Sequence, residues 1–171
     1  MVPLRQIRIA AVATIVTAAV ACSAPAPADR EPDGATRSPS RAISSRLVDL
    51  TNIERTRAGL DELRPNAALD RAARIQADQL AAAGRLDHTV RGAHYPRLED
   101  RLAAAGYAWR TIGENLAFGQ GNVATAIETW MRSDSHRANI LNGEFTEVGA
   151  AQSVDRNGRP YYVQVFARPS S

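Results

Sequence analysis

Residues 147–167 have the sequence EVGAAQSVDRNGRPYYVQVFA and decide the fold class. Two β-rich runs, Glu147–Val154 and Pro160–Ala167, flank a charged segment that contains Asn157-Gly158. An Asn-Gly pair between two such runs favours the positive-φ turn of a β-hairpin. We therefore expect two antiparallel strands near the C-terminal end of the chain.

Helical segments precede this hairpin. Apolar side chains at three- and four-residue spacing predict helices over residues 44–58, 67–83, 96–105 and 122–132. Ser44 or Ser45 can cap the first helix and Gly59 can end it. A third strand is expected over Thr111–Phe118. Helices followed by a small antiparallel sheet imply an α+β fold and not a βαβ array.

The N-terminus has the features of a secretory signal peptide. Arg5 and Arg8 precede the uncharged apolar run Ile9–Ala21, and no acidic residue occurs before Asp29. The run suits the apolar region of a signal peptide and is too short to span a bilayer, which needs ~20 apolar residues. We therefore expect residues 1–21 to be a signal peptide and the rest of the chain to be exported.

Cys22 is the single cysteine of the chain and directly follows Ala19-Val20-Ala21. One thiol excludes an internal disulfide, and an unmodified thiol is reactive in an oxidising compartment. The segment resembles a bacterial lipobox, in which the cysteine becomes the lipidated first residue. We expect a lipoprotein at the outer face of the cytoplasmic membrane. Plain secretion is the alternative, because Leu is commoner than Ala three residues before the cysteine.

The positive net charge belongs mainly to the signal segment. The chain has 21 basic residues, all arginine, and 18 acidic residues. Two of the arginines lie in residues 1–21, which leaves 19 basic against 18 acidic residues. The arginines do not interleave with aromatic residues, so the composition gives little support to nucleic-acid binding. The absence of lysine excludes Schiff-base chemistry and a Ser–Lys dyad.

A segment of low hydrophobicity follows the cysteine. Residues 22–43 are rich in Pro, Ala, Ser and charged residues and have no sustained apolar pattern. Such a segment cannot bury enough apolar surface to offset the entropy of ordering. We therefore expect a disordered tether over 22–43 and one domain over 44–168, which is an ordinary length for a single domain.

Four residues could carry chemistry: the loop histidines His88, His94 and His136, and Glu114. Glu114 lies in the apolar segment Gly113-Glu114-Asn115-Leu116, where a buried carboxylate needs a partner, either a histidine or backbone amides. The chain has no HExxH metal motif and no GxSxG nucleophile elbow. With Cys22 at the anchor, no cysteine nucleophile remains.

An ordered set of short motifs covers nearly all of residues 46–167. Its main members are Asn52–Arg55, Asp87–Thr89, Gly113–Leu116, Trp130–Ser133, His136–Leu141, Phe145–Gly149 and Tyr161–Phe166. In this order and spacing the set resembles the bacterial branch of the CAP superfamily. That superfamily, whose domain is also called SCP-like, contains cysteine-rich secretory proteins, insect-venom allergens and plant pathogenesis-related proteins. Each motif alone is weak, but the ordered set is specific.

The resemblance implies a three-layer α-β-α sandwich with a three-stranded antiparallel sheet and a cleft lined by His and Glu side chains. By this resemblance, His88 corresponds to the first histidine of the family's cleft and Glu114 to its first glutamate. His136 matches the histidine that bacterial members have after the tryptophan helix. The cleft lining is expected to include Asn115, Ser133 and Tyr161.

Three positions depart from the family's pattern. Ser133 stands where eukaryotic members have a second glutamate, and Tyr161 stands where they have a second histidine. Gln76 occupies a position where many bacterial relatives have a histidine. Eukaryotic members line the cleft with two histidines and two glutamates, and this chain has only one of each pair, His88 and Glu114. This weakens the case for metal binding of the eukaryotic kind.

Three functional hypotheses remain open. The domain could be an extracytoplasmic module that binds a small apolar ligand, an envelope component or a protein partner. Alternatively, His88, Glu114 and His136 form a His/Glu-based or metal-assisted hydrolase site, with a divalent metal such as zinc, for an envelope or peptide substrate. In the third hypothesis these residues are a structural hydrogen-bond network. We favour the binding module over an enzyme and expect no nucleic-acid partner.

Overall fold

A four-stranded sheet in the order β1-β3-β4-β2 forms the central layer of the domain. The computed structural model describes residues 39–170. β3 (Glu147–Val154) and β4 (Pro160–Pro169) pair antiparallel, and β2 (Trp109–Phe118) pairs antiparallel with β4. The short β1 (Arg64–Pro65) pairs parallel with the start of β3. This strand was not predicted, and it makes the sheet mixed instead of purely antiparallel.

The predicted hairpin is confirmed, and its turn has a clear chemical origin. Asp155 Oδ1 accepts hydrogen bonds from the backbone N–H groups of Asn157 and Arg159 at 2.9 and 3.0 Å. Gly158 has a φ of 74°, which a residue with a side chain rarely adopts. The turn residues therefore fix the register in which β3 and β4 pair.

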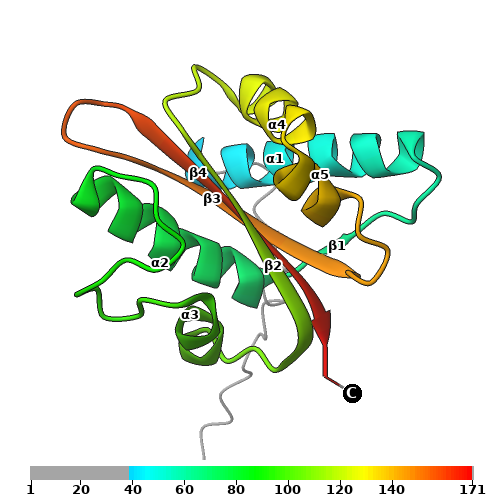
Figure 1. The fold of residues 1–171 in the computed structure, drawn as a ribbon, viewed down its shortest axis with the longest axis horizontal. Coiled ribbons are helices and arrows are strands. Elements are labelled where there is room, and N and C mark those ends of the chain that lie inside the picture. The colour runs from blue at the N-terminus through cyan, green and yellow to red at the C-terminus, as the bar shows by residue number, and fades with distance from the viewer. Residues whose placement is uncertain (1–38, 171) are drawn as a thin grey trace, which may run out of the picture. The chain divides into compact units, whose positions relative to one another are not determined.

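Helices cover both faces of the sheet, as Figure 1 shows. One face carries α2 (Ala67–Ala83) and α3 (Leu98–Ala104), and the other carries α1 (Pro39–Arg57), α4 (Val123–Arg132) and α5 (Asp134–Ile140). The expected α-β-α sandwich is thus confirmed. α2 has the predicted bounds because the Asn66 side chain caps its first turn and Gly84 ends it in a left-handed conformation.

Two helical features differ from the prediction. α1 begins at Pro39, so residues 39–43, which the sequence assigned to the tether, belong to a helix. Proline is favoured in the first turn because its missing N–H has no intrahelical partner there. α5 was not predicted at all. The expected signal peptide, Cys22 and the rest of the tether lie outside the described residues.

Successive side chains of each strand point to opposite faces of the sheet, and the two faces form two separate hydrophobic cores. On β4, Tyr161, Val163 and Val165 face α2, whereas Tyr162 and Phe166 face α1 and α4. Figure 1 shows the sheet between these layers. None of the helices within residues 39–170 combines the length and apolar character needed to cross a membrane.

Arg55 and Asn52, the ends of the motif Asn52–Arg55, have structural roles. Arg55 is 2% exposed, and its guanidinium donates to the carbonyl oxygens of Asp61, Ile140 and Asn142 at 2.8–2.9 Å. Burial lowers the pKa of Arg55. One turn earlier, the Asn52 side chain pairs with both the N–H and the carbonyl of Leu63. These two residues hold the loop after α1 and the end of α5 in place.

Candidate functional site

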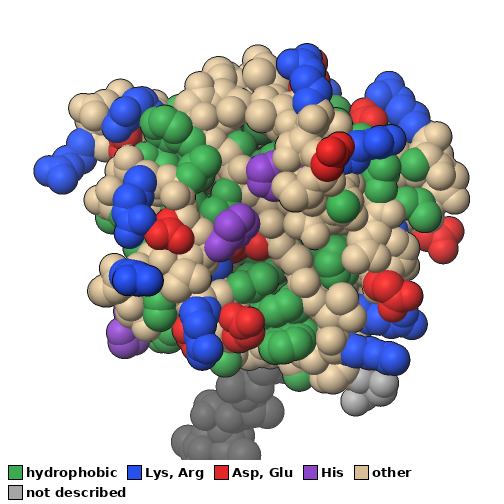
Figure 2. Space-filling view, viewed as in Figure 1, with side chains coloured by type: hydrophobic (Ala, Val, Ile, Leu, Met, Phe, Trp, Pro, Cys, Tyr) green, Lys and Arg blue, Asp and Glu red, His purple; other side chains and the backbone are tan. Residues whose placement is uncertain are grey.

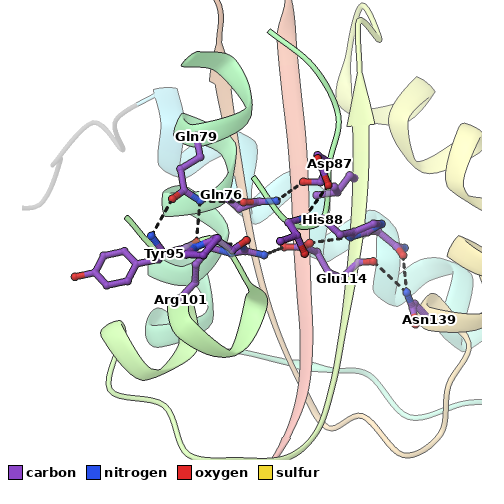
Figure 3. Close-up of polar contacts among 12 residues, drawn as sticks. Gln76, Gln79, Asp87, His88, Tyr95, Arg101, Glu114 and Asn139 are labelled. Atoms are coloured by element: carbon purple, nitrogen blue, oxygen red, sulfur yellow. Dashed lines mark hydrogen bonds and ion pairs between the residues drawn. The ribbon is translucent and has the colours of Figure 1, made fainter. Parts of the chain in front are cut away.

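Glu114 lies at the centre of a polar network on the α2 and α3 side of the sheet (Figure 3). Its side chain is 4% exposed. Oε2 accepts a hydrogen bond from Arg101 Nη2 at 2.7 Å, and Oε1 accepts one from His88 Nδ1 at 2.9 Å. The prediction that this carboxylate needs a partner is confirmed for His88. The second partner, Arg101, was not predicted.

Arg101 is fully buried on α3. Its Nη1 also donates to the carbonyl oxygen of Pro96 at 2.9 Å and lies 3.4 Å from that of Tyr95. The sequence did contain a sign of this role: Arg101 falls on the apolar stripe of its helix with Leu98 and Leu102. A charged residue on a core-facing stripe requires a partner of opposite charge.

Two glutamines of α2 hold the loop that carries His88. Gln76 Nε2 donates to the carbonyl of Asp87 at 2.8 Å. Gln79 accepts from the N–H of Tyr95 at 3.3 Å and donates to its carbonyl at 3.2 Å. Figure 3 shows both glutamines turned toward this loop. Gln76, one of the three departures from the family's pattern, therefore fixes the loop through the backbone of Asp87.

β2 is an edge strand, and the side chains of Asn115, Asn139 and Trp130 link it to α4 and α5. Asn115 Nδ2 donates to the carbonyl of His136 at 3.0 Å. Asn139 Nδ2 donates to Asn115 Oδ1 at 2.9 Å and to the carbonyl of Glu114 at 3.2 Å. Trp130 Nε1 donates to the carbonyl of Leu116 at 2.9 Å. These contacts place His136, on α5, next to the strand that carries Glu114.

The network leaves two imidazoles close together. Figure 2 shows two histidine side chains side by side in the middle of one face of the domain. The hydrogen bond to Glu114 raises the pKa of His88. Burial, followed by the positive charge of His88, lowers the pKa of His136. The structure thus bonds His88 to Glu114 and places His136 within electrostatic range of His88. His94 instead packs edge-on against Tyr95, with ring centroids 4.3 Å apart.

The predicted cleft lining needs correction. Asn115 and Tyr161 are both 0% exposed and line no open surface. Tyr161 packs on Phe118 in the α2-side core, with ring centroids 4.7 Å apart. The β2–β4 register pairs it with Phe118, four residues beyond Glu114, so it lies too far along the sheet. Ser133 is half-buried between α4 and α5, and its Oγ lies 3.3 Å from that of Ser135.

The observed geometry does not fit a metal ion held by His88, Glu114 and His136. Both carboxylate oxygens of Glu114 are already bonded, one of them to the Arg101 guanidinium. A fixed cation at this distance repels a second one. Within residues 39–170, no three His, Cys, Asp or Glu side chains gather into a set that could hold a metal ion.

We predict that calorimetric titration with Zn²⁺ shows no saturable binding below roughly micromolar concentration, where a formed zinc site would bind far more tightly. His88→Ala and Glu114→Gln serve as comparison variants, and both should give the same flat titration as the wild type. Saturable binding by the wild type that either substitution abolishes would contradict this reading of the site.

The two histidines should affect stability in opposite directions. The folded pKa of His88 is raised, so its contribution is present below the unfolded value of ~6.5 and lost as the pH rises through its folded pKa. The folded pKa of His136 is lowered, so stability falls as the pH drops through ~6.5. Proton NMR titration should therefore give His88 the higher pKa. In His88→Gln the pKa of His136 should rise, and an unchanged value would show that the imidazoles do not interact.

The sandwich and the His–Glu pair over its sheet define a CAP-type domain. The profile of the CAP, cysteine-rich secretory protein, family matches residues 48–166. The chain belongs to this family.

Three related proteins are similar over most of the domain. The uncharacterized protein YkwD of Bacillus subtilis (strain 168) is 34% identical over 127 residues, which cover 72% of this chain and 49% of YkwD. An extracellular protein with an SCP domain from Bacillus anthracis str. Ames matches with a TM-score of 0.67 and 26% identity, over 75% of this chain and 41% of that one. A cysteine-rich secretory protein from Staphylococcus aureus subsp. aureus Mu50 matches with a TM-score of 0.59 and 26% identity, over 77% and 40%. This chain thus spans half or less of each relative.

Proposed function

We propose that this chain is an exported, lipid-anchored CAP-domain protein that acts as a binding module at the cell envelope. The observation that carries the proposal is that each carboxylate oxygen of Glu114 is hydrogen-bonded, one to Arg101 and the other to His88. A carboxylate fixed by two hydrogen bonds is poorly suited to act as a nucleophile or base. The network instead bonds the loop that carries His88 to α2 and to the sheet, and a preformed surface favours binding.

Export rests on the chain's own N-terminus and on its relatives. Arg5, Arg8 and the apolar run Ile9–Ala21 have the order that signal peptides require. The Bacillus anthracis protein, 26% identical, is an extracellular protein. Lipid attachment at Cys22 would keep the domain at the outer face of the cytoplasmic membrane, with a membrane as its partner. Without attachment the protein would be secreted.

The anchor is tested by Cys22→Ser. We expect the wild type in the membrane fraction and the variant in the medium, because one acyl-bearing cysteine is the only proposed membrane contact. The matched control is Ser23→Ala, a change next to the cysteine that should leave the wild-type distribution unchanged. Wild-type protein found wholly in the medium, or Cys22→Ser that stays in the membrane fraction, would refute the anchor.

A hydrolase acting on an envelope or peptide substrate is the second candidate, and one observation favours it. His88 and His136 are neighbours whose pKa values are shifted in opposite directions, a pattern that suits an acid and a base. Turnover of purified envelope fragments that is lost in His136→Gln would establish this activity. Unchanged fragments after prolonged incubation would leave binding as the function.

A further inference from the structure

The dipeptide Asn-Gly occurs twice in the chain, at Asn142-Gly143 and at Asn157-Gly158. This dipeptide is especially prone to spontaneous deamidation, because glycine has no side chain to shield its backbone nitrogen from the asparagine amide. The dipeptide alone does not distinguish the two sites. The structure does, because it places them in different surroundings.

Hydrogen bonds hold both the side chain and the carbonyl of Asn142. Its Oδ1 accepts a hydrogen bond from the backbone N–H of Glu144 at 2.8 Å. Its carbonyl oxygen accepts one from Arg55 Nη1 at 2.8 Å, and this buried guanidinium also bonds the carbonyl of Ile140. Deamidation requires the side chain and the peptide bond that follows it to turn toward each other. At Asn142 this rotation would break a bond to a buried charge, which is costly.

Asn157 lies in the exposed turn between β3 and β4, at one end of the sheet (Figure 1). Its side-chain amide makes no hydrogen bond to any residue within 39–170. One bond restrains the peptide that follows, since the N–H of Gly158 donates to the carbonyl of Asp155 at 2.9 Å. That bond joins two neutral groups in a surface turn, where local opening costs far less free energy than global unfolding. Asn157 can therefore reach the reactive geometry while the domain stays folded.

We propose that Asn157 is the deamidation site of the folded domain and that Asn142 is protected from the same reaction. The backbone nitrogen of Gly158 attacks Cγ of Asn157, which forms an N–Cγ bond. The bond from Cγ to the side-chain nitrogen breaks, and this nitrogen leaves as ammonia together with the proton of the Gly158 amide. Water then opens the succinimide ring, at Cγ to give isoaspartate's isomer aspartate, or at the main-chain carbonyl carbon to give isoaspartate. The reaction consumes water, releases ammonia and involves no oxidation or reduction.

The products would alter the turn that fixes the β3–β4 register. A carboxylate at position 157 would lie close to Asp155, whose Oδ1 accepts the N–H of that residue. Isoaspartate also adds a carbon atom to the main chain, whereas the register of a hairpin depends on the length and type of its turn. Modified chains should therefore unfold at a lower urea concentration than unmodified ones. This inference is independent of the proposed binding function, because it involves no ligand.

Peptide mapping by mass spectrometry tests the proposal on the purified chain after incubation at mildly alkaline pH. The peptide that contains Asn157 should acquire the mass change from amide to carboxyl at least about tenfold faster than the peptide that contains Asn142. In concentrated urea, where both sites lose their hydrogen bonds, the two rates should approach each other. Labelling by isoaspartyl methyltransferase identifies the isoaspartate product.

A pair of matched variants tests the restraint on the turn. Asp155→Ala removes the carboxylate that bonds two backbone N–H groups of the turn, so it should speed deamidation at Asn157 and leave Asn142 unaffected. Asp78→Ala, the same change at an exposed position on α2, should alter neither rate. Asn157→Gln should abolish the modification at this position, because glutamine cyclises much more slowly. Equal rates at the two sites in the folded chain, faster reaction at Asn142, or a tenfold difference that persists in urea would overturn the proposal.

Discussion

Replacing Arg101 with Met is expected to lower the free energy of unfolding by about 3 to 5 kcal/mol, the cost of leaving a buried charge without its partner. The Glu114 side chain is 4% exposed and would keep only its bond to His88. The loop would also lose the bond between Arg101 and the carbonyl of Pro96. Urea denaturation followed by circular dichroism measures the change.

Two further variants make the result specific to the buried pair. Arg97→Met is the same substitution four residues earlier, on an exposed arginine paired with Asp100, and should leave stability nearly unchanged because exposed ion pairs contribute little. In Arg101→Met/Glu114→Gln the uncompensated charge is gone, so part of the lost stability should return. Equal stability of Arg101→Met and Arg97→Met would contradict the assigned role of Arg101.

Local chemistry made much of the fold predictable. The Asn157-Gly158 turn and the β-rich runs beside it act through neighbouring residues only, so the hairpin followed from the sequence. The caps of α2 are equally local: Asn66 bonds the first turn and Gly84 ends the last one. Elements that depend on neighbouring residues and on a regular spacing of apolar side chains could be predicted from the sequence. The order of the motifs supplied the three-layer arrangement.

The parts that were missed depend on contacts between distant residues. α5 has seven residues and buries only Ile140, so it has no apolar period and would be marginal in isolation. It persists because Asn115 on β2 and Arg55 on α1 bond its backbone. The two-residue β1 likewise exists only through its pairing with β3.

In the site, too, the features set by neighbouring residues were predictable and those set by distant contacts were not. Glu114 could be recognised as a buried carboxylate that needs a partner, because its apolar neighbours surround it in the sequence. The choice of Arg101 over backbone amides depends on how α3 lies on the sheet. Tyr161 was placed at the cleft by the resemblance alone, and the strand register moves it into the core. The family's motifs thus identified the important residues correctly, but they did not predict all of the contacts that those residues make.

Gly149→Ala is expected to be among the most destabilising single substitutions in the domain, because α2 lies directly against β3 at this residue. An ideal Cβ on Gly149 would lie 2.2 Å from backbone atoms of Leu69 and Asp70. Backbone at the start of a helix cannot swing away as a side chain can, so α2 must shift on the sheet. Asp70, whose Oδ1 accepts from the N–H of Ala150 at 2.9 Å, would shift with it. We expect a loss of about 3 kcal/mol or more, at the upper end for overpacking.

Two other glycines supply a graded comparison by urea denaturation. At Gly113 an added Cβ would meet the Phe145 ring at 2.9 Å and Asn139 Oδ1 at 3.0 Å, and both are side chains that can adjust. At Gly121 nothing lies within 4 Å. Stability should therefore fall most in Gly149→Ala, less in Gly113→Ala and hardly at all in Gly121→Ala. If Gly149→Ala were as stable as Gly121→Ala, α2 could not lie against β3 as closely as described.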